Sequence, residues 1–304
     1  MWFNNALIYQ YEIDEACDLT ASLAENNLKP CPPHARFVYG WLPVFADEFV
    51  QDIAGSSLIC MGKEERLLHR GVINKMLSEK VQILETQQGR IIKRAEKAQL
   101  AEDIEFELLP KSFCIQKRLL AILDSVSKRI IINASSTTQA SQLTSLLRKS
   151  VAGISIEPLT HKENLALRFA QWIHSAGTLP DSFQLASDCL LFSLDDDKKR
   201  IHCKGYELPA EEILTLLSQG MATAEISLIW KERIQFTLTH DFTFKKLKSL
   251  DYLLDDFNDI KQLDEEYQQK DAALTLLSGE LRELTNDLLA ALAIKEQEPI
   301  LEEV

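Results

Sequence analysis

The spacing of apolar residues changes repeatedly along this 304-residue chain, and no other feature of the sequence constrains its fold as strongly. In short segments the apolar residues alternate with polar ones or cluster as β-branched and aromatic side chains, which is typical of strands. In other segments they recur every three or four residues, which indicates amphipathic helices. No apolar run approaches the roughly 18 residues of a membrane-spanning helix. The pattern predicts a mixed α+β (α/β) fold with several sub-domains.

The predicted elements follow one another from the first residues to the last. Strands are predicted for residues 6–11, 36–41, 56–61, 119–123, 129–133, 225–230, 234–239 and 242–247. Helices are predicted for residues 14–24, for a stretch that begins at Gly71, for residues 138–148, and between Pro209 and Gly220. Within the strand pattern of the last predicted strand, Lys246 and Lys248 would share one face and Lys245 would lie on the other.

The helix that begins at Gly71 has one apolar stripe, formed by Val72, Ile73, Met76, Leu77, Val81 and Leu84. Gly89 is expected to interrupt this helix, because glycine is a poor helix former. The densest basic cluster of the chain follows, within residues 90–97, and Pro110 closes the next helix.

A second helical stripe lies near the C-terminus, where Leu274, Leu277, Leu281, Leu284 and Leu288 step by three and four residues. Two heptads are too short to predict a coiled coil, so packing against the chain's own core is expected. The alternative is an acidic protein-interaction scaffold that holds a partner on this leucine seam without binding DNA.

Charge is distributed unevenly along the chain. The formal net charge is −13, which taken alone argues against a nucleic-acid partner. Residues 63–149, however, hold 16 basic and 10 acidic residues, while residues 251–304 hold 4 basic and 15 acidic ones. Phosphate binding depends on local potential, so one basic region can hold a polyanion while the acidic remainder repels it. A solvated helix face explains the same basic residues without any ligand.

Catalytic and metal-binding motifs are not visible in the sequence. There is no G-x-S-x-G, Walker A, G-x-G-x-x-G or H-E-x-x-H pattern, and the six cysteines lack C-x-x-C spacing. Cys31 and His34 have the spacing of half a zinc site, but no second pair follows. We therefore expect no enzyme activity, cofactor or metal, and a cytoplasmic location without a secretory signal. A hydrolase or nuclease with a dispersed site stays an alternative.

Several separated segments together resemble the family of bacterial recombination-associated proteins named RdgC. The segments, in chain order, are Trp2-Phe3-x-Asn5, Gly40-Trp41-x-Pro43, Lys63-Glu64-Glu65-Arg66-Leu67-Leu68, Leu108-Leu109-Pro110-Lys111-Ser112-Phe113, Leu146-Leu147-Arg148-Lys149-Ser150, Trp230-x-x-Arg233-Ile234-Gln235-Phe236, Lys245-Lys246-Leu247-Lys248 and, more loosely, Ser278-Gly279-Glu280-Leu281. Each motif alone is weak, whereas the collinear set is specific. The resemblance runs from residue 2 to about residue 294.

The resemblance implies a curved protomer that closes with a second copy into a ring around duplex DNA, with single-stranded DNA left open as a partner. It also implies restraint of the RecA recombinase and association with the nucleoid. The expected divisions are residues 1–70 (N-terminal α/β), 71–115 (helical arm with the basic cluster and gate segment), 116–250 (central α/β) and 251–304 (acidic C-terminal helical region).

By the same resemblance, Phe113 would fill a dimer contact at the gate through which DNA enters; without the family, it reads equally well as a core residue beside Pro110. The candidate DNA-binding residues are Arg66, Lys75, Arg90, Lys93, Arg94, Lys97, Lys111, Lys204, Arg233, Lys246 and Lys248. Met221 and Glu225 stand where relatives would have lysines, and Gly205 and Tyr206 follow Lys204 in place of a basic pair. Fewer cations predict a shallower salt dependence of DNA binding.

Overall fold

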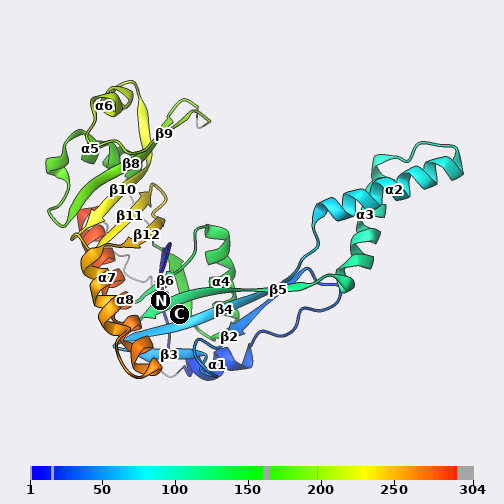
Figure 1. Ribbon diagram of the computed structural model, residues 1–304, viewed down its shortest axis with the longest axis horizontal. Coiled ribbons are helices and arrows are strands. Elements are labelled where there is room, and N and C mark those ends of the chain that lie inside the picture. The colour runs from blue at the N-terminus through cyan, green and yellow to red at the C-terminus, as the bar shows by residue number, and fades with distance from the viewer. Residues whose placement is uncertain (1, 15–16, 160–163, 197, 293–304) are drawn as a thin grey trace, which may run out of the picture. The chain divides into compact units, whose positions relative to one another are not determined.

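A computed structural model describes residues 2–14, 17–159, 164–196 and 198–292 of the chain (Figure 1). The chain divides into two compact units: unit 1 contains residues 1–17, 50–59 and 120–304, and unit 2 contains residues 18–49 and 60–119. Strands β4 (Ser56–Arg66) and β5 (Cys114–Asp124) contribute residues to both units. The predicted mixed α+β fold is confirmed. Among the described residues, no helix has the length and apolarity needed to cross a membrane.

The first sheet of unit 1 is built around β1 (Leu7–Glu12). This strand runs antiparallel to β6 (Arg129–Ile132) and to β7 (Ser155–Pro158). Strand β6 also pairs with the last residues of β5, and β3 (Val50–Ile53) pairs with the first residues of β4. The predicted helix after β6 is α4 (Thr137–Ser150), and the Ser136 hydroxyl caps it by accepting the Gln139 amide.

The second sheet of unit 1 has five antiparallel strands in the order β12-β11-β10-β8-β9. Their bounds are β8 Phe183–Ser193, β9 Arg200–Cys203, β10 Met221–Trp230, β11 Ile234–Thr239 and β12 Phe244–Ser249. Alternate residues of β10, namely Ile226, Leu228 and Trp230, are buried on one face. Helices α5 (Leu165–His174) and α6 (Glu211–Ser218) contact this strand.

Two acidic helices, α7 (Asp251–Ile260) and α8 (Glu266–Ala291), end the described part of unit 1. All five leucines of the seam in α8 are at most 2% exposed. The prediction that this stripe packs on the chain's own core is therefore confirmed. The alternative that the leucine seam holds a partner is wrong, because its side chains are already covered. Residues 293–304, the end of the predicted acidic region, lie outside the described residues.

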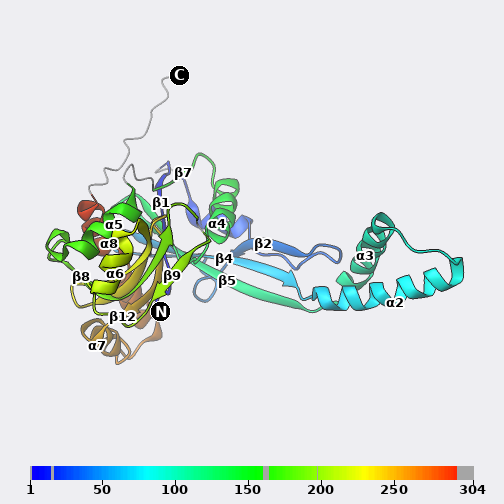
Figure 2. The same ribbon diagram turned by 90° about the horizontal axis from the view of Figure 1, so that it is seen from above.

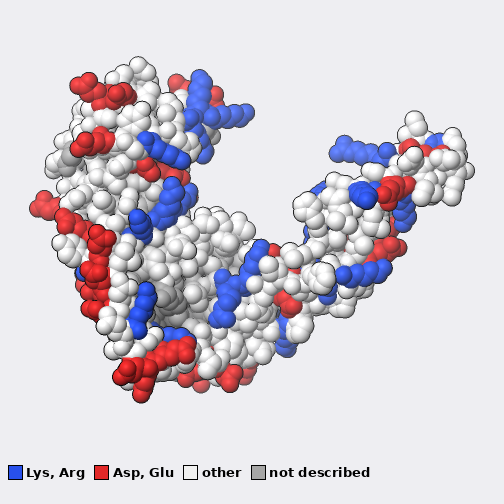
Figure 3. All heavy atoms as spheres, viewed as in Figure 1, with Lys and Arg blue, Asp and Glu red and all other residues white. Residues whose placement is uncertain are grey.

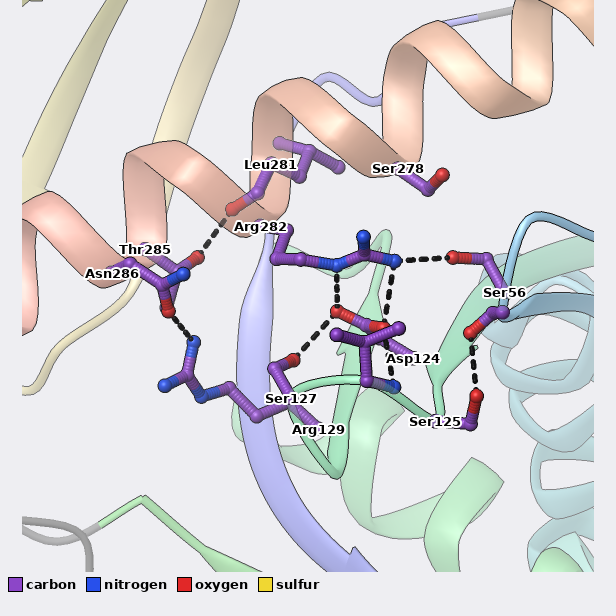
Figure 4. A network of polar contacts seen from close by, with 12 residues as sticks. Ser56, Asp124, Ser125, Ser127, Arg129, Ser278, Leu281, Arg282, Thr285 and Asn286 are labelled. Carbon is purple, nitrogen blue, oxygen red and sulfur yellow. Dashed lines mark hydrogen bonds and ion pairs between the residues drawn. The ribbon is translucent and has the colours of Figure 1, made fainter.

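A buried ion pair fastens α8 to the first sheet (Figure 4). Arg282 donates from Nε to Asp124 Oδ2 at 2.6 Å and from Nη2 to Asp124 Oδ1 at 2.8 Å. The same guanidinium reaches Ser56 Oγ at 3.2 Å, and the Ser127 hydroxyl donates to Asp124 at 2.6 Å. Burial by itself would raise the pKa of Asp124, but these hydrogen bonds outweigh it, so the pKa lies below its ordinary value.

Unit 2 combines a short sheet with two long helices. Strand β2 (Phe37–Leu42) runs antiparallel to the second half of β4. Helices α2 (Arg70–Gln88) and α3 (Arg94–Leu108) lie side by side, and the turn η1 (Leu109–Lys111) follows (Figure 2). The predicted interruption at Gly89 is confirmed: this residue ends α2 in the left-handed conformation, with φ 64°.

Two predicted helices of unit 2 differ in detail from the structure. Helix α1 is Leu19–Glu25 and begins later than expected, because Asp18 caps it by accepting the Ala21 amide; residues 15 and 16 of the predicted helix lie outside the described residues. The apolar stripe of α2 is covered only in part. Val72 is 47% exposed, whereas Val81 on the same helix is buried.

Strand β2 is an edge strand, and its second half is covered by residues 26–28. Leu28 donates its amide to the Trp41 carbonyl at 2.8 Å, and Trp41 donates to the Asn26 carbonyl at 3.0 Å. This close approach depends on Gly40, since a Cβ there would lie 2.4 Å from the Leu28 Cα.

Arg66, at the end of β4, holds two loops of unit 2 together. Its guanidinium donates to the carbonyls of Cys31 (3.1 Å), Pro32 (3.2 Å), Leu109 (3.0 Å) and Ser112 (3.2 Å). Four backbone acceptors are thus satisfied by one planar side chain, a geometry that suits arginine and no other residue.

We predict that Asp124→Asn lowers the free energy of unfolding by about 2–4 kcal/mol at pH 7, because Arg282 loses its buried counter-charge. Urea unfolding measures this. Asp124 has a depressed pKa, so its stabilising effect is complete above its ordinary value, about 4, and disappears as the pH falls through the lower folded value.

The variant should therefore lose less stability than the parent between pH 5 and pH 3. Lys270→Ala, which removes an exposed ion pair with Glu266 on the same helix, is the control and should change stability by less than about 0.5 kcal/mol. Equal losses in the two variants would contradict a special role for the buried pair.

We predict that Arg66→Lys destabilises unit 2 by about 1–3 kcal/mol, because an ammonium cannot reach four carbonyls at once. Hydrogen exchange of the Leu67 amide, which donates to the Phe113 carbonyl at 2.7 Å, reports this locally. Exposed Arg94→Lys is the control and should leave exchange unchanged. Unchanged exchange in Arg66→Lys together with weakened DNA binding would instead make Arg66 a DNA contact.

Candidate nucleic-acid interface

The basic cluster of unit 2 lies where α2 turns into α3. The left-handed Gly89 reverses the chain, and the Ile92 amide donates to Glu85 Oε1 at 2.9 Å to fix the connecting loop. The loop and the first turn of α3 carry the predicted DNA-binding residues Arg90, Lys93, Arg94 and Lys97, all exposed or half-buried.

Two of these four cations are already balanced by carboxylates of the same unit. Arg90 makes a two-pronged contact with Glu96, at 2.9 and 2.8 Å, and these hydrogen bonds lower the pKa of Glu96. Lys97 Nζ lies 3.8 Å from Glu85 Oε1. Within the described residues, Lys93 and Arg94 have no carboxylate within 4 Å. They make no ion pair there, although the charge of Lys93 contributes, after Arg90, to the lowered pKa of Glu96.

Phe113 lies between η1 and β5 in unit 2. The residue is 84% exposed, and its carbonyl accepts the Leu67 amide. The alternative that Phe113 is a core residue beside Pro110 is therefore wrong. Lys111, two residues earlier in η1, and Lys75 on α2 are exposed as well.

Two predicted DNA-binding residues have their donors engaged inside the protein. Arg66 donates to four backbone carbonyls, as described above. Arg233, in unit 1, donates to Glu280 at 2.6 Å and to Asp256 at 2.7 Å. Hydrogen bonding to Glu280 raises the pKa of Arg233 above its ordinary value. Both arginines thus hold structure together, a role that residue type and spacing do not distinguish from phosphate binding.

Two of the remaining candidates lie on β12 of the five-stranded sheet, and the third follows β9 directly. Lys204, Lys246 and Lys248 are all exposed. In Figure 3 the acidic side chains of unit 1 gather along α7 and the start of α8, whereas many basic ones lie toward β9 and β12. On the face that Figure 3 shows, further acidic side chains lie near α6 and beside β9.

The predicted alternation along β12 is wrong, because the strand contains a bulge. Lys248 lies opposite Gln235 and Lys245 opposite Thr237, so two residues, Lys246 and Leu247, face the single intervening position of β11. Lys246 has φ 53°, and Lys245 and Lys248 lie opposite residues of one face of β11. Lys245 donates to Glu225 at 2.9 Å. Sequence alternation alone cannot reveal such a bulge.

Sequence reasoning did not single out two further groups of lysines, one just before β9 and one on β4 and β5. Lys198 and Lys199 are exposed beside the start of β9. In unit 2, Lys63 and Lys117 flank Glu65 on a face that also bears Phe37 and Tyr39. Phe37, Tyr39 and Trp41 alternate in the sequence, and this pattern could have indicated that the three side chains share one face of a strand.

The half zinc site has a structural use. Cys31 Sγ lies 3.4 Å from the Ala35 carbonyl, and the His34 ring stacks on Phe106 with centroids 3.9 Å apart. Among the described residues, no three His, Cys, Asp or Glu side chains gather in a metal-binding arrangement. Neither residue contributes to a recognisable coordination sphere there.

Comparison with known proteins identifies the family. A family model described as "Putative exonuclease, RdgC" matches residues 1–295. The recombination-associated protein RdgC of Salmonella typhimurium is 31% identical over 299 residues, which cover 96% of this chain and 98% of that protein. Proteins of the same name from Salmonella typhi and Salmonella paratyphi B match to the same extent. The chain belongs to the RdgC family.

Proposed function

We propose that this chain binds DNA without sequence preference, closes as a homodimeric ring around duplex DNA, and thereby limits RecA-promoted recombination at the nucleoid. The observation that carries the DNA-binding part is the exposed pair Lys93 and Arg94, which has no carboxylate neighbour within 4 Å among the described residues. Family membership supports the link to recombination.

Phosphate contacts would supply the affinity. Each neutralised phosphate releases counterions, so the logarithm of the binding constant falls with the logarithm of salt concentration by about 0.9 per contact. Such contacts hold the duplex without reading bases. A ring suits this task, since its inner surface can be basic while acidic helices such as α7 face solvent.

Internal pairing reduces the number of cations that DNA can use. Arg90, Arg233 and Lys245 each contact a carboxylate, and Arg66 contacts backbone carbonyls. DNA must displace those partners or do without these residues. The affinity for DNA should therefore depend only modestly on salt concentration, as the small number of basic residues in the sequence also predicts.

The proposal is tested by light scattering together with duplex titrations at about 50 and 200 mM salt. A dimer whose affinity falls with salt is the expected result. A monomer, or affinity indifferent to salt, would overturn the ring or the phosphate contacts respectively. The family description also names an exonuclease; metal-dependent shortening of DNA by rigorously purified protein would favour that function instead.

We predict that Lys93→Gln combined with Arg94→Gln weakens binding to all duplex sequences alike, by about tenfold or more near 0.1 M salt, and reduces the salt slope by about 1.8 for each protomer of the ring that contacts the duplex. Fluorescence anisotropy with two unrelated duplexes measures both quantities. Lys261→Gln, at the exposed residue that follows the last turn of α7, is the control. A loss confined to one sequence would indicate base recognition.

A substitution that releases a cation should have the opposite effect on the salt slope. Glu96→Gln removes the negative charge that occupies Arg90 and should increase the salt slope by up to about 0.9 for each protomer that contacts the duplex. No increase would mean that Arg90 does not reach phosphate even when released.

We predict that Phe113→Asp opens the ring without dissociating the dimer, because a closed two-fold ring has a second, separate contact. The parent protein should stay on covalently closed circular DNA in about 1 M salt and slide from linear DNA of the same length. The variant should leave both. Tyr252→Asp, a similarly exposed aromatic residue of α7, is the control. Circular DNA that retains the variant would contradict a gate at Phe113.

A further inference from the structure

One face of the short sheet in unit 2 joins an exposed ring, Phe37, and a half-buried one, Tyr39, to lysines. In the antiparallel pairing of β2 with β4, Phe37 lies opposite Glu65 and Tyr39 opposite Lys63. Directly opposed residues share a face of a sheet, so these four side chains project together. Lys117 from β5 joins them through its ion pair with Glu65.

The other face of the same strands is already used inside the unit. Glu64 Oε2 accepts the Cys31 amide at 3.0 Å, and Arg66 donates to the carbonyls of Cys31 and Pro32. Successive strand residues point to opposite faces, which separates these contacts from Lys63 and Glu65. The aromatic face is left more open: Phe37 is 48% exposed, and the Lys117 side chain is 59% exposed.

The two rings and the ammonium groups are arranged as one surface. The ring centroids of Phe37 and Tyr39 are 5.3 Å apart, with planes tilted by 57°. Lys63 Nζ lies 5.0 Å from the Phe37 centroid and 6.0 Å from that of Tyr39. Glu65 contacts both lysines and so fixes their positions, and these hydrogen bonds, from Lys117 and then Lys63, lower the pKa of Glu65.

From this arrangement we propose that the face formed by Phe37, Tyr39, Lys63 and Lys117 binds single-stranded DNA. Unpaired bases stack on the aromatic rings, which duplex DNA cannot offer because its bases are already stacked. Two lysines against one glutamate leave a positive balance for the phosphates that join the stacked bases. This inference deepens the proposed DNA-binding function by assigning single strands to a surface separate from Lys93 and Arg94.

On this face stacking contributes more to binding, and charge contributes less, than in the basic cluster around Lys93 and Arg94. Stacking contributes most of the affinity, because Glu65 offsets one of the two ammonium charges. Single-strand binding should therefore depend less steeply on salt than duplex binding does, with a slope of at most about 1.4 for two phosphates.

The test measures the affinity of the full chain for a dT oligomer and for a duplex by anisotropy. Phe37→Ala should weaken dT binding roughly 5- to 150-fold, the range for loss of one base–aromatic stack, and leave duplex binding unchanged. Phe37→Trp should restore dT binding. Phe106→Ala, which removes another exposed phenylalanine of unit 2, is the matched control and should change neither affinity.

A second measurement does not depend on variants. A dT oligomer that carries 5-iodouracil, irradiated on the parent protein, should crosslink to the peptide containing Phe37 and Tyr39. Crosslinks confined to other peptides, or unchanged dT affinity in Phe37→Ala, would overturn the inference while leaving duplex binding intact. A changed oligomeric state with unchanged dT affinity would show that a second copy occupies this face. Failure of the parent to bind duplex would overturn only the proposed function.

Discussion

The buried pair between Asp124 and Arg282 decides which surfaces unit 1 presents. It ties the middle of α8 to the end of β5, and with α8 held there the five leucines of its seam are covered. Asp255 and Asp259 of α7 and Glu266 of α8 are exposed, whereas Asp256 and Glu280 contact Arg233 inside the unit. The acidic character of this surface is thus a consequence of where the arginine is held.

Internal contacts also determine which arginines elsewhere in the chain can bind a phosphate. A guanidinium can bind a carboxylate, a row of carbonyls or a phosphate, and the chain uses its arginines in more than one of these ways. Arg66 and Arg233 are held by internal acceptors, while Arg94 is not. Counting basic residues therefore overestimates what a polyanion can contact. What matters is the number of basic side chains that do not already contact an acceptor inside the protein.

Much of the fold could be predicted from the sequence, because spacing reports burial directly. The helix from residue 137, the three strands between residues 221 and 249 and the buried leucine seam all follow from periodicity and caps. Strand β3 and the bulge at Lys246 could not be predicted, since each depends on a partner strand. The candidate site was predicted as a basic region, but which cations are paired depends on Glu85, Glu96 and Glu280, whose proximity arises only in three dimensions.

The contact between Gly40 and the Leu28 backbone also bears on how the protein behaves in a crowded cell. An uncovered edge strand offers its amides and carbonyls to any passing strand, which is a common start of aggregation. Here a single missing side chain lets the chain's own segment dock along half of that edge. Gly40, which has no side chain, thereby keeps part of the edge strand covered and protects the protein from aggregation. Even alanine at this position would disturb that cover.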